Sequence, residues 1–172
     1  MLTRKKPLRP KDSHWSLSCA DTAAHCLKIS DSIAWMPIVS NRAFIDTSVL
    51  LYLLSNDTDK ADRAEQVLTA GGTVSVQVLN EFAAVAHRKL QLAWPALHHV
   101  LSILRAALMV KSVSLVTHSR GVSVSERYGF SVYDSMIVAS ALESGCTTLI
   151  TEDLQHDQRI EGLRIFNPFR VD

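Results

Sequence analysis

Four acidic residues stand at positions where they could do chemistry together: Asp46, Glu81, Asp134 and Asp153. Like charges held close together repel one another, so a cluster of carboxylates needs a cation to neutralise it. Carboxylate oxygens suit Mg²⁺, with Mn²⁺ as the alternative. Such an ion activates water and offsets the negative charge that develops on a phosphate under attack. The four acids therefore point to metal-dependent chemistry on phosphate esters.

Asp46 and Asp134 have the same pair of interpretations. Asp46 ends the apolar run AFID, which is typical of a buried strand, and Asp134 opens an apolar helical segment. In open α/β sheets, ligands bind just beyond the carboxyl ends of the strands, which favours a functional role for both. The alternative is that each residue is only a helix N-cap, a position where Asp is preferred.

Glu81 lies on the same helical stripe as the apolar residues Val78 and Val85. A lone carboxylate on an apolar face is costly unless it is paired or binds a metal. The alternatives are a position at the margin of the stripe that reaches water, or an ion pair with Arg88 or Lys89. The position favours a functional carboxylate.

Asp153 follows the apolar run TTLI by three residues, again at the carboxyl end of an expected strand. Its segment, TEDLQHDQ, also contains Glu152 and Asp157. A solvated turn would explain these acids equally well. The choice of the fourth acid between Asp153 and Asp157 is therefore open at this point.

The elements that must position these acids follow one another from residue 41 onward. Predicted strands cover residues 43–46, 73–75, 112–117, 147–150 and, as an edge strand, 163–166. Predicted helices cover residues 47–54, 58–70, 76–90, 95–110, 118–127 with an interruption at Gly121, and 133–144. Strands separated by helices imply an α/β domain with a mainly parallel central sheet and helices on both faces.

Composition restricts the function classes. The chain has 172 residues, 47% of them hydrophobic and 20% charged, which favours one globular domain. Its net charge is only +1, with a balance of +3 over residues 1–40 and −2 over residues 41–172. A nucleic-acid binder that relies on charge alone is usually more basic. Contact with RNA therefore requires a local basic patch or a bound cation, and the basic candidates are Arg88, Lys89, Arg120 and Arg127.

Residues 1–40 differ from the rest in having no sustained periodicity. We expect a poorly ordered extension; the alternative is a basic arm that contacts RNA or a partner. The basic start is not followed by an apolar stretch, so a secretory signal is not predicted. No apolar run is long enough to span a bilayer, and the three cysteines form no C-x-x-C pair, which fits a cytoplasmic protein.

Four segments resemble, in order, the four acidic motifs of PIN-domain nucleases, and in particular the VapC-like toxins of bacterial type II toxin–antitoxin pairs. The segments are FIDTSVLL, VLNEF, YDSMIVASAL and LITEDLQH. The resemblance runs over residues 43–169, about three quarters of the chain. Each motif alone is weakly specific, whereas four in order, each on the expected element, are strongly specific.

The resemblance implies a Rossmann-like three-layer sandwich, the PIN domain, over residues 41–172, and Mg²⁺-dependent endoribonuclease activity. Asp46 and Asp134 match the principal metal ligands of the family, Glu81 matches the acid on the helix, and Asp153 matches the fourth acid. The hydroxyl positions that support this cluster are matched by Thr47 or Ser48 and by Thr151.

The resemblance also implies a homodimer and inhibition by a small antitoxin whose C-terminal segment blocks the crevice. The chain departs from the pattern at Asp157, where similar sequences often have Gly, and residues 1–40 have no counterpart. The RNA target is not indicated, and single-stranded or loop RNA is the default expectation.

Two other functions fit parts of the pattern. A phosphatase of the haloacid-dehalogenase type also has an Asp after its first strand, but it needs a second Asp two residues later. Here Asp46 is followed by Thr47 and Ser48, which argues against it. A catalytically silent PIN-like module that binds RNA or a partner is the main rival; the presence of all four acids argues against that one.

Overall fold

A single six-stranded sheet organises the computed structural model, which describes residues 42–170. The strand order is β3-β2-β1-β4-β6-β5. The strands are β1 (Ala43–Ile45), β2 (Thr73–Ser75), β3 (Met109–Lys111), β4 (Thr148–Ile150), β5 (Arg159–Ile160) and β6 (Leu163–Phe166). All neighbouring pairs are parallel except β5 and β6. The expected mainly parallel α/β sheet is confirmed.

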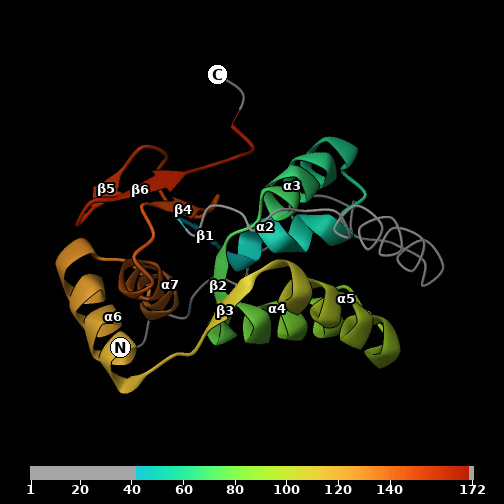
Figure 1. Cartoon of the computed structure of the whole chain (residues 1–172), viewed down its shortest axis with the longest axis horizontal. Coiled ribbons are helices and arrows are strands. Elements are labelled where there is room, and N and C mark those ends of the chain that lie inside the picture. Colours follow the sequence, from blue (N-terminus) through green and yellow to red (C-terminus); the bar gives the residue numbers. More distant parts are fainter. Residues whose placement is uncertain (1–41, 171–172) are drawn as a thin grey trace.

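Helices flank this sheet on both sides and complete a three-layer sandwich (Figure 1). They are α2 (Thr47–Leu51) with the 3-10 turn η1 (Tyr52–Leu54), α3 (Thr58–Ala70), α4 (Val76–Arg88), α5 (Trp94–Ala107), α6 (Leu115–Tyr128) and α7 (Val132–Glu143). Helix α7 contacts β2 and β4, and α6 packs outside it. No helix within residues 42–170 is both long and apolar enough to cross a membrane.

The core includes residues of α2, α3, α4 and α5, and one part of it lies between α7 and the centre of the sheet. Phe44, Leu149 and Ile165 occupy the same register on β1, β4 and β6, and all three are completely buried. Helix α7 is buried almost all round from Ser135 to Ala141, as its nearly continuous apolar sequence indicates. Burial of these side chains is the main stabilising contribution, about 1.5–3 kcal/mol for each large apolar side chain.

The predicted strand at 112–117 is wrong. Strand β3 lies three residues earlier, because α5 ends at Ala107 and not at Val110. Ser114 instead caps α6, and its hydroxyl and that of Thr117 form a reciprocal capping box. The apolar side chains of Leu115 and Val116 are 80% and 69% exposed, so this apolar run does not mark a buried strand.

The end of the sheet also differs from the prediction. Strand β6 is not an edge strand, because it pairs with β4 on one side and with β5 on the other. The edge is the two-residue strand β5, which the sequence did not reveal because such a short element has no periodicity to detect. The poorly ordered extension predicted for residues 1–40 lies outside the described residues.

Gly121 does not interrupt a helix. It lies inside α6, where this helix crosses α7, and a β-carbon there would stand 2.6 Å from Met136 Sδ and 3.3 Å from Met136 Cα.

We expect Gly121→Val to lower the free energy of unfolding by about 1–3 kcal/mol, because the two helices must separate. Urea unfolding would measure the change, with Ser119→Val on the exposed side of α6 as the control. Equal stability of the two variants would contradict this packing argument.

Candidate functional site

The site lies at the carboxyl ends of β1 and β4, two parallel strands at the centre of the sheet. Ile45 and Ile150 are register partners, and the Asp46 amide donates to the Ile150 carbonyl at 3.0 Å. The chain therefore leaves both strands side by side, with Asp46 on one and Thr151 on the other. This is the edge of a parallel sheet at which ligands bind in open α/β folds.

All four predicted acids meet at this edge. They line one pocket with a volume of about 190 Å³. The residues of this acidic pocket are Asp46, Thr47, Ser48, Leu51, Glu81, Asp134, Ile137 and Asp153. Thr151 and Leu154 line the adjoining space with Asp46, Asp134 and Asp153. The fold thus gathers residues that are separated by up to 107 positions in the sequence.

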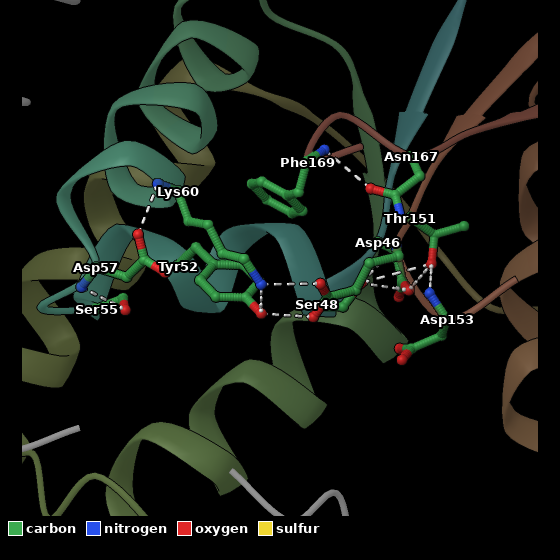
Figure 2. A network of polar contacts seen from close by, with 11 residues as sticks. Asp46, Ser48, Tyr52, Ser55, Asp57, Lys60, Thr151, Asp153, Asn167 and Phe169 are labelled. Atoms are coloured by element: carbon green, nitrogen blue, oxygen red, sulfur yellow. Dashed lines mark hydrogen bonds and ion pairs between the residues drawn. The ribbon is translucent and has the colours of Figure 1, made fainter. Parts of the chain in front are cut away.

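Asp46 is held by three donors. Its Oδ1 accepts from the Thr47 amide at 2.6 Å, and its Oδ2 accepts from the hydroxyls of Thr151 at 2.6 Å and Ser48 at 3.0 Å. Asp46 is also the N-cap of α2, so the capping role and the pocket position coexist. Oδ1 retains a lone pair for a further ligand. Figure 2 shows Thr151 close to both Asp46 and Asp153.

Burial raises the pKa of Asp46, and the negative charge of Asp134 raises it further. The hydrogen bonds from Thr151, Ser48 and the Thr47 amide oppose this shift, because they stabilise the charged form. The surroundings of Asp46 therefore destabilise its ionised form. A cation in the pocket would offset that destabilisation.

Glu81 and Asp134 approach the pocket from α4 and α7. The Thr47 hydroxyl donates to Glu81 Oε2 at 3.4 Å. Asp134 is not the cap of α7: that role belongs to Ser131, whose hydroxyl accepts from the Asp134 amide and makes a short hydrogen bond to Asp134 Oδ2. Ser131 was not predicted, although a Ser three residues before an acid at a helix start is a recognisable capping signal.

The structure separates Asp153 from Asp157. The Asp153 amide donates to the Thr151 hydroxyl at 3.1 Å, and its side chain lines the acidic pocket. Asp157 points elsewhere and accepts from Arg164 Nη2 at 2.6 Å and Nε at 2.7 Å. Geometry therefore favours Asp153 as the fourth acid of the cluster.

A second polar network supports the loop that carries Asp153. Lys60 Nζ donates to the Tyr52 hydroxyl at 2.7 Å, which donates to Glu152 Oε1 at 2.8 Å, and Lys60 also pairs with Glu152 at 3.5 Å. In Figure 2 the side chains of Tyr52 and Lys60 lie near the ring of Phe169, whose centroid is 4.6 Å from that of the Tyr52 ring. The sequence did not reveal this network, because its members lie up to 100 positions apart.

The oxygen atoms that line the acidic pocket suit a hard divalent cation as ligands. The pocket offers carboxylate and hydroxyl oxygens together with two apolar side chains. Within the described part of the chain, no three His, Cys, Asp or Glu side chains are grouped as a ready-made cage for one ion. Mg²⁺ suits such a site, because it usually takes one or two carboxylates and keeps several waters.

Comparisons with known proteins agree with this fold. Among solved structures, the fold is similar to a toxin–antitoxin complex from Klebsiella pneumoniae (TM-score 0.59, 20% identity, covering 75% of this chain and 99% of that one). It is also similar to VapC20 of Mycobacterium tuberculosis, described as a sarcin–ricin loop cleaving toxin (TM-score 0.53, 18% identity, covering 62% of this chain and 86% of that one). A third similar structure is the DNA-bound VapBC of Salmonella typhimurium (TM-score 0.53, 21% identity, covering 73% of this chain and 97% of that one).

Sequence comparison identifies the family directly. A search of curated proteins found no match. The sequence model of the PIN domain, however, matches residues 43–160, more than half of the chain. This region contains β1, β4 and every acid of the pocket. The chain therefore belongs to the PIN-domain family.

Proposed function

We propose that this protein is a Mg²⁺-dependent endoribonuclease and the toxin of a toxin–antitoxin pair. The observation that carries the proposal is the convergence of Asp46, Glu81, Asp134 and Asp153 on one pocket at the ends of β1 and β4. The similarity in fold to VapC20, which is described as a toxin that cleaves the sarcin–ricin loop, supports RNA as the substrate.

In this proposal, the residues of the pocket have separate tasks. Asp46 and Asp134 hold the cation, with Mn²⁺ as an alternative to Mg²⁺, and the hydroxyls of Ser48 and Thr151 fix the Asp46 carboxylate. The bound cation offsets the charge of the phosphate and makes an attacking water more nucleophilic. Glu81 and Asp153, which are less buried than Asp46, complete the ligation or accept a proton from the water.

The proposal extends to partners. One of the similar structures is described as a toxin–antitoxin complex and another as DNA-bound VapBC, which supports a small antitoxin that blocks the acidic pocket. A homodimer and a cytoplasmic location belong to the same proposal. Co-purification of a tagged chain with the product of a neighbouring gene would test the antitoxin.

Cleavage of structured and single-stranded RNAs by purified protein with Mg²⁺ tests the proposal. We expect Glu81→Gln, Asp134→Asn and Asp153→Asn to reduce the rate on the order of 10²–10³-fold, because each removes a carboxylate that holds the cation or accepts a proton from the attacking water. The controls are Asp62→Asn and Glu126→Gln, two exposed acids outside the pocket, which should cleave at the wild-type rate.

The comparison separates the proposal from its rival. Equal cleavage by the wild type and the pocket variants would place the activity elsewhere or in a contaminant. Tight RNA binding by the wild type without any cleavage, with or without metal, would instead support a catalytically silent module.

A further inference from the structure

The predicted basic candidates leave the question of RNA binding open. Arg120 and Arg127, on α6, both approach Glu161, with nitrogen–oxygen distances of 2.8 and 3.9 Å. Their positive charges are therefore partly neutralised. The acidic pocket itself repels RNA in the absence of a cation. A larger groove, on the α3 side of the sheet, gathers three other arginines.

This arginine groove has a volume of about 700 Å³ and lies between α3 and the sheet. The residues of α3 that line it include Arg63, Gln66 and Val67. The opposite wall comes from β6 and the segment after it, with Phe166 and Arg170. The volume is in the range of pockets that bind small organic ligands, so a nucleotide fits within it.

The register of the strands explains why this face of the sheet is open. Along β6, Leu163 and Ile165 are buried, whereas Arg164 and Phe166 alternate with them and are exposed. Phe166 is the register partner of Ile150 on β4, so the two side chains share the face that looks toward α3. Helix α3 covers only part of this face, and the uncovered part is the arginine groove.

The groove carries net positive charge. Arg63, Arg164 and Arg170 line it, against one carboxylate, Asp157. That carboxylate is bound by Arg164 and lies beside His156 at 3.4 Å. Hydrogen bonding from Arg164 lowers the pKa of Asp157, so it is ionised at neutral pH. Three guanidinium groups and one carboxylate give the groove a net charge of +2, although residues 41–172 as a whole have a balance of −2.

An aromatic surface accompanies the charges. Phe166 is 36% exposed, and the ring of His156 lies 5.5 Å from it, centroid to centroid. Arg164 extends over the Phe166 ring at 5.9 Å. Proteins that bind single-stranded nucleic acids combine basic grooves with aromatic side chains on which bases stack. The arginine groove offers both.

The groove and the acidic pocket are lined from one loop, although none of residues 42–170 lines both. Ile150 lines the arginine groove, and Thr151, the next residue, donates to Asp46. The same loop then carries Asp153 into the acidic pocket and His156 into the groove. Asp153 and His156 are three residues apart, so their Cα atoms lie at most about 11 Å from each other, a distance that an RNA strand of a few nucleotides spans.

We propose that the arginine groove binds the single-stranded segment of RNA that flanks the phosphate held at the acidic pocket. The inference rests on the proposed ribonuclease function and adds to it the path of the substrate. It assigns phosphate contacts to Arg63 and Arg170 and base stacking to Phe166. It also gives Asp157 a role as a carboxylate that competes with RNA phosphates for Arg164.

Binding of fluorescent single-stranded RNA, measured by anisotropy in EDTA so that the RNA stays intact, tests the groove. We expect the double variant Arg63→Gln/Arg170→Gln to bind an RNA of about 12 nucleotides on the order of tenfold more weakly than the wild type. Its log–log dependence of affinity on salt should be shallower by about 1.4, the value for two lost phosphate contacts on a single strand. The matched control is Arg105→Gln, an exposed arginine on α5 outside the groove.

A second variant should act in the opposite direction. Asp157→Asn removes the competing carboxylate, and we expect it to tighten binding of the same RNA about threefold. Asp157 has a positive φ of 63°, a conformation that Asn also adopts readily, so the backbone should be preserved. Thermal unfolding of each variant would confirm that the fold is intact.

The outcomes separate this inference from the proposed function. Unchanged RNA affinity in both variants, with Mg²⁺-dependent cleavage by the wild type, would overturn the groove and leave the nuclease standing. Unchanged RNA affinity with weaker binding of a protein partner would assign the groove to that partner and overturn it as well. RNA affinity that depends on the groove, in a wild type that cleaves nothing, would support the groove and contradict the nuclease.

Discussion

Replacing Asp46 with Asn is expected to lower the rate of RNA cleavage on the order of 10³-fold, because it removes the buried charge that holds the cation. The same change should stabilise the protein at neutral pH without divalent cations. Burial raises the pKa of Asp46, so its ionised form costs free energy in the folded state. An Asn side chain keeps the hydrogen-bonding geometry, since the hydroxyls of Ser48 and Thr151 can rotate to accept from its amide group.

The sign of the pH dependence follows from that shift. Below the ordinary Asp pKa of 3.8, the group is protonated in both the folded and the unfolded chain and costs nothing. As pH rises from 3.8 to the higher pKa of the folded state, the folded chain holds the proton more tightly, so stability contributed by this group falls. The Asp46→Asn variant should lack this decline.

Thermal unfolding against pH, with EDTA and with Mg²⁺, measures the effect. In EDTA at neutral pH, the variant should unfold at a higher temperature than the wild type. Added Mg²⁺ should raise the unfolding temperature of the wild type more than that of the variant, because the variant lacks one of the two carboxylates that hold the cation. A variant that is less stable than the wild type in EDTA would contradict the claim that burial destabilises the ionised form of Asp46.

Thr151→Val is expected to lower both the stability of the protein and its rate of RNA cleavage. The side chain is almost the same size, but the variant loses the 2.6 Å hydrogen bond to Asp46 Oδ2 and the acceptor for the Asp153 amide. Hydrogen bonds to charged groups contribute about 1.5–3 kcal/mol, so the free energy of unfolding should fall by a similar amount. Cleavage should slow by about 10–100-fold, because a hydroxyl that orients a metal ligand is lost.

The conservative variant Thr151→Ser separates the hydroxyl from the shape of the side chain. It keeps the donor, so most of the activity should return, while a small loss of stability from the missing methyl group remains. Urea unfolding and RNA cleavage, measured on both variants, provide the comparison. Full cleavage by Thr151→Val would show that this hydroxyl does not position Asp46.

The sequence by itself determined the parts of this protein that depend on local patterns. Apolar runs that end in an acid or are soon followed by one predicted β1 and β4, and the position of Glu81 on an apolar stripe predicted a functional carboxylate. Helix α3 and strand β2 have the predicted bounds, because Gly71 ends the helix and begins the connection to the strand. These signals are strong because each depends on neighbours within one or two turns of chain.

Only the tertiary structure decided where distant residues meet. It placed Asp153 in the acidic pocket and Asp157 with Arg164, a choice that neighbouring acids in one loop left open. It placed β3 before residue 112, because the burial of a short apolar run depends on what packs against it. It also brought three arginines from α3, β6 and the segment after β6 to one groove. Side-chain contacts across 100 positions depend on strand order and register, which no local pattern contains.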